Sequence, residues 1–309
     1  MPSGVTGLDA MLNGGFFNRS MNFVAGYSGT GKSVIGYHFV DSGLRASEPV
    51  PLVSLKTPPE QILSQAESLG MYWGNTLRTG LLSIQHYHTT DLCTEEMVTE
   101  ILRLVSERVP GRVLFEGIGD LWNASRNEED VRNTLLLLSS IFESFGITSR
   151  ATDQTQHMGG DGGNRHDYTD LADCVIQLSM AESEGELRRF VGVHKHRGSE
   201  HAKELREFHI GPFGFRVERK AVGLSGILTG QTQGALRQVG EEVLPSLDRV
   251  ADLLRSLADS GGTPQSIRNQ LSEARSNLGL VDVLLREHFG VTAFHELTEQ
   301  SETSESPRV

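Results

Sequence analysis

The chain has 309 residues, 37% of them hydrophobic, and a formal net charge of −12. This length accommodates one large domain and a smaller part, and the acidic balance argues against a general nucleic-acid binder or a membrane-surface protein. No apolar run reaches the roughly 18 residues of a membrane helix, and the N-terminus lacks a basic-then-apolar leader. The two cysteines, Cys93 and Cys174, fall in different predicted elements, so we expect a reduced, cytoplasmic protein.

The first predicted elements lead into a glycine-rich loop. Residues 6–15 form turns around a short helix, and residues 21–25 form a short apolar run that is typical of a buried strand. The loop GYSGTGKS at residues 26–33 fits the pattern G-x-x-x-x-G-K-[ST]. Apolar residues then recur at helical spacing, and Gly43 stands where we expect that helix to stop.

The loop pattern predicts a site for nucleotide phosphates. Glycines allow backbone angles that a Cβ forbids, so successive N–H groups can turn toward an anion at the start of a helix. Lys32 then places a cation on the β- and γ-phosphates, and Ser33 offers a hydroxyl to Mg²⁺. We assign ATP binding to the loop residues Gly26, Ser28, Gly29, Thr30, Gly31, Lys32 and Ser33.

Strands and helices alternate through the following residues, which predicts right-handed crossovers and a mostly parallel sheet. The predicted strands are residues 51–55, 81–84, 112–116 and 147–152, and the helices are residues 59–69, 95–109 and 130–145. Four short strands then follow closely, at residues 174–178, 190–193, 207–210 and 215–217. They predict an antiparallel extension of one sheet edge, with Cys174 in the core. Residues 157–168 are rich in Gly, Asp and His and predict a mobile loop.

The last part of the chain has a different pattern. We expect the main domain to span residues 1–222, an αα-hairpin residues 223–295, and a disordered tail residues 296–309. Apolar residues in two runs fall on one seam each at spacings of three and four, which predicts coiled-coil-like packing. Thr263 as N-cap and Pro264 as the first helical residue open the second helix. The hairpin either packs on the main domain or serves a protein partner or self-association.

The opening and the close of the main domain together resemble the KaiC-type ATPases of the RecA-like superfamily. The opening carries TGLD at residues 6–9, LNGG at residues 12–15 and the P-loop. The close carries ADCVIQL at residues 172–178, KHRGSEH at residues 195–201 and EFHIGPFG at residues 207–214. The segment GILTG at residues 226–230 is also similar to one that often follows such domains. The resemblance covers roughly residues 3–230.

The resemblance implies a RecA-like α/β domain that assembles into a ring, usually a hexamer, with ATP between neighbouring subunits. In that arrangement Lys195, Arg197 and His201 reach the γ-phosphate of the neighbour's nucleotide. Two cations and an imidazole so close together near a strand end suit a polyphosphate. The alternative is a solvated, charged strand end.

Two departures from the family pattern concern catalysis. The strand at residues 51–55 is followed in this family by two glutamates that activate water, and here those positions hold Lys56 and Thr57. Neither side chain is a useful base near pH 7, and losing a general base typically lowers a rate by about 10²–10⁴. The Walker B position holds Glu116, which we assign to Mg²⁺ together with Ser33 and as the candidate catalytic residue; Asp120 is a weaker alternative.

Three functions follow from these observations. The leading hypothesis is an ATP-binding, ring-forming signalling or regulatory protein with weak hydrolysis. The second is an active ATPase or autokinase that uses Glu116 or Asp120, with Thr169 a poor match to the phospho-accepting position of the family's clock member. The third is a RecA-type DNA-binding recombinase, which the acidic chain disfavours.

Overall fold

The computed structural model describes residues 1–125, 127–154, 170–183, 186–220, 224–225, 233–234, 247–253, 255 and 264–289. The chain divides into two compact units. The first comprises Met1–Ala221 with Ile227–Gln231, and the second comprises Val222–Gly226 with Thr232–Val309. None of the described helices is long and apolar enough to span a lipid bilayer.

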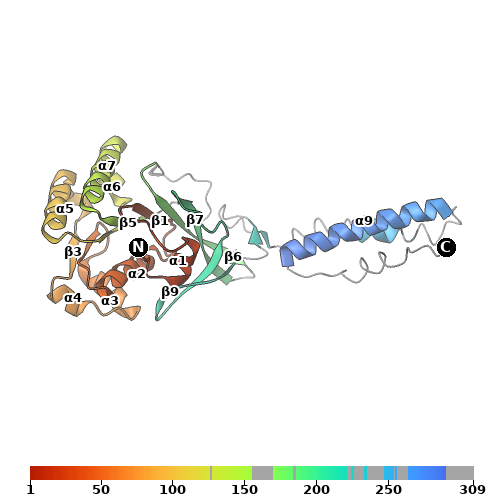
Figure 1. Ribbon diagram of the computed structural model, residues 1–309, viewed down its shortest axis with the longest axis horizontal. Helices are drawn as coiled ribbons and strands as arrows, with labels where there is room; N and C mark the ends of the chain where they lie inside the picture. Colours follow the sequence, from red (N-terminus) through yellow and green to blue (C-terminus); the bar gives the residue numbers. More distant parts are fainter. Residues whose placement is uncertain are drawn as a thin grey trace, which may run out of the picture. The chain divides into compact units, whose positions relative to one another are not determined.

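A nine-stranded sheet forms the centre of the first unit (Figure 1). Its strand order is β3-β2-β4-β5-β1-β6-β7-β8-β9. Its strands are β1 (Met21–Gly26), β2 (Val50–Ser54), β3 (Leu82–His86), β4 (Arg112–Glu116), β5 (Thr148–Gln154), β6 (Cys174–Ser183), β7 (Glu186–His196), β8 (Arg206–Gly211) and β9 (Gly214–Lys220). Strands from β3 to β6 run parallel, and β7 to β9 continue the sheet in antiparallel pairs. The predicted α/β fold, with a parallel sheet extended by antiparallel strands, is therefore confirmed.

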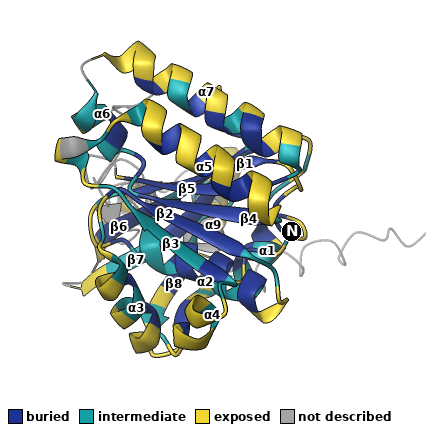
Figure 2. Cartoon of the chain, turned by 90° about the vertical axis from the view of Figure 1, so that its left-hand side faces the viewer, coloured by how far each residue is buried: buried dark blue, intermediate teal, exposed yellow. Residues whose placement is uncertain are grey.

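Helices cover both faces of this sheet (Figure 2). The helices of the first unit are α1 (Thr6–Met11), α2 (Lys32–Arg45), α3 (Pro59–Ser68), α4 (Gly74–Arg78), α5 (Thr94–Arg108), α6 (Asp120–Ala124) and α7 (Glu128–Phe145), with a 3₁₀ turn at Thr89–Asp91. Helices α5 and α7 pack on one face, whereas α2 and α3 pack on the other. This layering explains the sequence pattern, because strands covered on both faces are apolar throughout. In β4, Val113 and Phe115 contact one layer and Leu114 the other.

The predicted end of the first long helix at Gly43 is wrong. Helix α2 continues to Arg45, and Gly43 lies buried within it. A Cβ at Gly43 would lie 2.7 Å from Cδ and Nε of Arg112 and 2.8 Å from Cγ2 of Val50. The glycine therefore makes room for the buried Arg112 side chain, whose Nε donates to Glu48 Oε2 at 2.7 Å and whose Nη1 donates to the Phe39 carbonyl at 2.9 Å.

The described residues of the second unit are two short strands and two helical segments. Strands β10 (Leu224–Ser225) and β11 (Gln233–Gly234) pair antiparallel, which the sequence pattern does not indicate. Residues 247–253 and 255 are helical, and α9 (Pro264–Phe289) begins at the proline expected to open it. Thr263 and the tail at residues 296–309 lie outside the described residues, so the hairpin and the tail stay predictions.

Candidate functional site

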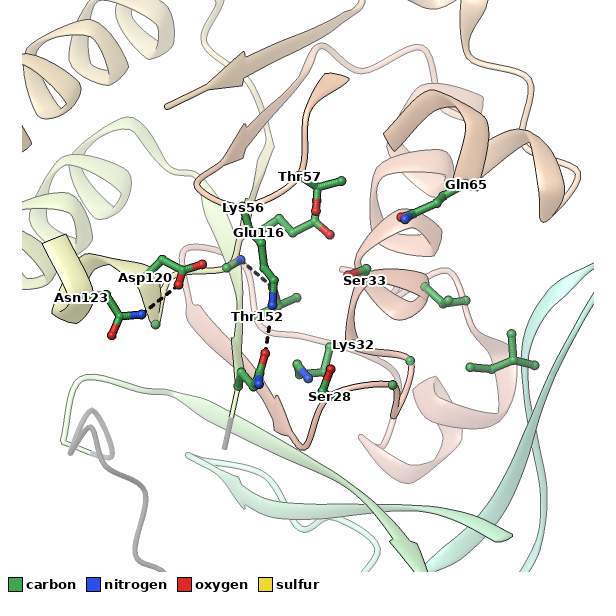
Figure 3. A pocket seen from close by; sticks show the side chains of 17 residues that line it. Ser28, Lys32, Ser33, Lys56, Thr57, Gln65, Glu116, Asp120, Asn123 and Thr152 are labelled. Carbon is green, nitrogen blue, oxygen red and sulfur yellow. Dashed lines mark hydrogen bonds between the residues drawn. The ribbon is translucent and has the colours of Figure 1, made fainter. Parts of the chain in front are cut away.

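The candidate site is a pocket of about 640 Å³ at the carboxyl ends of the central parallel strands (Figure 3). The loop after β1 and the start of α2 form one wall, with Ser28, Gly29, Gly31, Lys32 and Ser33. The turn after β2, the end of β4 with α6, and the end of β5 complete it. The structure thus brings the predicted loop residues and Glu116 to one place.

The loop after β1 takes the backbone form that its glycines were expected to allow. Gly29 and Gly31 have φ angles of +79° and +100°, a region that residues with a Cβ rarely occupy. Gly26 and Thr30 lie behind the pocket wall: Thr30 is buried and its hydroxyl donates to the Tyr27 carbonyl at 2.8 Å. Helix α2 begins directly after Gly31, so its N-terminal amides face the pocket. An anion held there would meet both the loop amides and the helix dipole.

Lys32 is folded back onto its own loop. Its ammonium donates to the carbonyl oxygens of Gly26 and Tyr27, both at 2.8 Å. Burial, and to a smaller extent the positive charge of Lys56, lower the pKa of Lys32 to about 8, while the charge of Asp153 acts in the opposite direction. A phosphate group beside this ammonium would supply the negative charge that burial makes favourable.

Glu116 and Ser33 provide oxygen atoms that fit Mg²⁺. Glu116 is 3% exposed, and its Oε1 accepts a hydrogen bond from the Tyr37 hydroxyl at 3.3 Å. Its Oε2 is buried without a hydrogen-bond partner among the residues the structure describes. Burial raises the pKa of Glu116, while the Ser33 and Tyr37 hydroxyls and the Lys56 charge lower it. A buried, under-satisfied carboxylate oxygen next to a hydroxyl suits a hard divalent cation.

Lys56 and Thr57 line the same pocket at the positions expected to differ from the family pattern. The Lys56 ammonium donates to Gln154 Oε1 at 2.9 Å, and the Thr57 amide donates to the Ser54 hydroxyl at 2.9 Å. Asp120 also lines the pocket, and its Oδ1 accepts a hydrogen bond from Asn123 at 3.0 Å. Two lysines therefore stand where a polyphosphate would lie, and Asp120 is the additional carboxylate there.

Several pocket residues were not predicted. The polar ones are Gln65, Asn123, Thr152 and Gln154, and Ile210 of β8 adds an apolar wall beside Gly31. A signal for Thr152 existed, because it ends the predicted strand at residues 147–152 and parallel strands end at one edge of a sheet. Its hydroxyl accepts from the Gly117 amide at 2.9 Å. Ile210 comes from an antiparallel strand far along the chain, and no local pattern places it here.

The predicted group of Lys195, Arg197 and His201 does not lie at the carboxyl ends of the parallel strands, where the pocket is, but near their amino ends. Lys195 pairs with Val175 of β6, which pairs with Phe23 of β1. The Arg197 amide donates to the Asp173 carbonyl at 2.8 Å, and the Asp173 amide donates to the Met21 carbonyl at 2.8 Å. Arg197 is therefore level with the start of β1, five residues before Gly26, or roughly 17 Å along the strand.

None of these three residues lines the pocket of its own chain. Arg197 also donates from Nη2 to the Asp170 carbonyl at 2.7 Å and lies 3.8 Å from Asp173 Oδ1. The His201 ring lies 6.5 Å from the His196 ring, between centroids. Thr169 and the loop at residues 157–168 lie outside the described residues.

Comparisons with known proteins agree with the resemblance. The family model described as "ATPase: KaiC" matches residues 1–222. Over 231 residues the chain is 29% identical to circadian clock protein KaiC3 of Synechocystis sp., covering 74% of this chain and 45% of that protein. It is 26% identical over 261 residues to circadian clock oscillator protein KaiC of Acaryochloris marina, covering 84% and 48%. The chain thus spans about half the length of the curated relatives it matches.

Proposed function

Because this chain belongs to the KaiC ATPase family, we propose that it binds Mg·ATP between neighbouring copies of itself and hydrolyses it slowly. In this proposal it is a signalling or regulatory protein whose assembly state, expected to be a hexameric ring, reports bound nucleotide. The clock role in the relatives' names belongs to proteins about twice the length of the matched segment, and we do not extend it to this chain.

The observation that carries the proposal is the separation of two anion-binding groups on one sheet. The phosphate pocket lies at the carboxyl ends of β1, β4 and β5, whereas Arg197 is level with the amino end of β1. A single chain therefore does not bring both groups to one nucleotide. If one copy presented its Arg197 edge to the pocket of the next, each nucleotide would meet both groups. Such a head-to-tail contact forms a ring when the rotation closes.

In the proposed complex the loop amides and the start of α2 hold the phosphates. The Lys32 ammonium would leave the carbonyls of Gly26 and Tyr27 for the β- and γ-phosphates. Ser33 and Glu116 would hold Mg²⁺, which when bound neutralises charge on the β- and γ-phosphate oxygens. Arg197 from the next copy would add a fixed charge at the terminal phosphate.

Slow hydrolysis follows from the side chains at the turn after β2. Lys56 and Thr57 line the pocket there, and neither removes a proton from water near pH 7. Asp120 supports the second candidate function, an active ATPase, because its carboxylate lines the same pocket. An ATPase assay separates the two: turnover comparable to that of ordinary ring ATPases, lost in Lys32→Ala, would reject slow hydrolysis. Loss of such turnover in Asp120→Ala would support the relocated base.

The assembly is tested by measuring mass in solution with and without Mg·ATP. We expect ATP to drive assembly of the wild type, and both Lys32→Ala and Arg197→Ala to stay small. An equimolar mixture of the two variants is the sharpest control. In one of its interfaces the intact pocket of the Arg197→Ala chain meets the intact Arg197 of the Lys32→Ala chain. That mixture should form dimers, while each variant alone should not. Wild-type-like assembly of Arg197→Ala, with Arg78→Ala on α4 as the matched control, would contradict the shared site.

A further inference from the structure

The side chain of Lys56 extends past the carboxyl end of β4 toward the P-loop. Lys56 follows β2, yet its ammonium donates to Gln154, the last residue of β5. Strand β4 lies between β2 and β5, and β1, which carries the P-loop, is the next strand beyond β5. The ammonium therefore ends one strand away from the P-loop, on the pocket side, and Figure 3 shows the side chain pointing toward the end of the pocket that holds Lys32.

Two lysine ammonium groups thus converge on one pocket. The hydrogen bonds of Lys32 go to two backbone carbonyls, and that of Lys56 goes to a side-chain amide oxygen. Within the part of the chain that the structure describes, neither lysine has a carboxylate oxygen within 4.0 Å. The charge of Lys56 helps to lower the pKa of Lys32. An anion between the two ammonium groups would relieve this repulsion.

We propose that Lys56 is a ligand for the terminal phosphate within its own chain, and that it makes the site prefer nucleoside triphosphates over diphosphates. The proposal rests on nucleotide binding at this pocket, as proposed above. In the proposed complex the amides of the loop after β1 hold the phosphates closest to the nucleoside, and Lys32 reaches the β- and γ-phosphates. Lys56 approaches from β2 across the end of β4, the strand that ends in Glu116. Because Ser33 and Glu116 are assigned to the Mg²⁺ that bridges the β- and γ-phosphates, we place the last phosphate of a triphosphate on this side of the pocket. A diphosphate ends before it reaches this ammonium.

This role differs from that of the P-loop lysine. Lys32 contacts the β-phosphate, which both nucleotides have, in addition to the γ-phosphate, so its loss weakens binding of both nucleotides. Lys56 contacts a phosphate that only the triphosphate has, so its loss changes the ratio of affinities. A charge-assisted hydrogen bond is worth roughly a ten- to hundredfold change in affinity. Lys56 also fixes the nucleotide state that the assembly recognises, because in the empty or diphosphate-bound pocket its ammonium interacts with Gln154 and with the charge of Glu116 but with no terminal phosphate.

The test compares the affinities of the full chain for ADP and for a non-hydrolysable ATP analogue, both with Mg²⁺, by titration calorimetry. The variants are Lys56→Met and Lys56→Arg, with Lys220→Met, an exposed lysine at the end of β9, as the matched control. We expect the wild type and Lys220→Met to prefer the triphosphate. Lys56→Met should lose about ten- to hundredfold of that preference with its ADP affinity unchanged, and Lys56→Arg should retain most of it.

Other outcomes would overturn the proposal in distinguishable ways. A wild type that binds both nucleotides equally, or a Lys56→Met that keeps the preference, would refute the role of Lys56 and leave nucleotide binding intact. Equal weakening of both nucleotides in Lys56→Met, with a lowered unfolding temperature, would show that Lys56 only supports the pocket through Gln154. A wild type that binds neither nucleotide would remove the proposed function and this inference with it.

Discussion

The P-loop lysine predicts a pH dependence of nucleotide binding. Lys32 has a pKa of about 8 because it is buried and faces Lys56. A polyphosphate beside it favours the charged form, so the pKa of Lys32 rises when nucleotide binds. Between the two pKa values, binding takes up a proton, and affinity therefore falls as the pH rises above about 8. Below that value Lys32 is charged in both states, and the affinity is insensitive to its titration.

The magnitude follows from the fraction of free protein in which Lys32 is charged. With a pKa of about 8, this fraction is about 0.9 at pH 7 and about 0.1 at pH 9, so the dissociation constant for ATP should rise roughly tenfold. Titration calorimetry at the two pH values measures the change. Repeating the pH 9 titration in buffers of different ionisation enthalpy measures the proton taken up.

Lys32→Arg is the matched control, because a guanidinium stays charged throughout this range. The ATP affinity of this variant can be lower, since a guanidinium is larger than an ammonium, but its affinity should change little between pH 7 and pH 9. An equal pH dependence in wild type and Lys32→Arg would place the titration on another group. An ATP affinity of the wild type that is the same at both pH values would refute the reasoning from burial.

Three further predictions concern packing, acid stability and hydrolysis. Gly43→Ala should lower the free energy of unfolding by about 1–3 kcal/mol, measured by urea unfolding, because its methyl group would meet Arg112; an unchanged stability would mean that α2 shifts freely. Burial lowers the pKa of His38 to about 4, and its Nε2 accepts a hydrogen bond from a β9 amide at 2.8 Å. The free energy of unfolding should therefore fall as the pH drops from about 6.5 toward 4, because His38 of the unfolded chain takes up a proton first. Urea unfolding at pH 7 and pH 4.5 should show a smaller loss in His38→Gln, and equal losses would count against it. The double variant with Lys56→Glu and Thr57→Glu should hydrolyse ATP about 10²–10⁴ times faster than the wild type in a phosphate-release assay, whereas turnover that does not rise would mean that more than a base is lacking.

Much of the fold followed from the sequence because its signals are local. The apolar run at residues 21–25, the glycine-rich loop and the helix after it identify one another within about 25 residues, and the structure contains β1, the loop and α2 in that order. The alternation of strands and helices then indicated a parallel sheet, and the four short strands indicated its antiparallel edge. The strand predicted at residues 112–116 matches β4 at both ends.

What the sequence could not indicate depends on contacts between distant residues. Gly43 looked like a helix end because glycine ends many helices, yet its role depends on Arg112, which arrives 69 positions later. The position of Lys56 in the chain showed which residue was replaced, but not that its ammonium extends to the end of β5. Ile210 joins the pocket wall only because β8 packs against the P-loop. In each case tertiary packing decides the role, and no periodicity records it.

The polarity of the sheet connects these observations. In a parallel sheet the loops that follow the strands all lie at the carboxyl ends of the strands. The strand order therefore brings together the P-loop, Lys56, Glu116 and Gln154. An antiparallel strand in the same sheet ends at the amino ends of its parallel neighbours. Strand β7 is antiparallel to β6, so Arg197, which follows it, lies at that end. Arg197, which the resemblance assigns to a terminal phosphate, is level with the start of β1, roughly 17 Å along that strand from Gly26 of the P-loop. Strand direction thus agrees with the proposed site that two copies share.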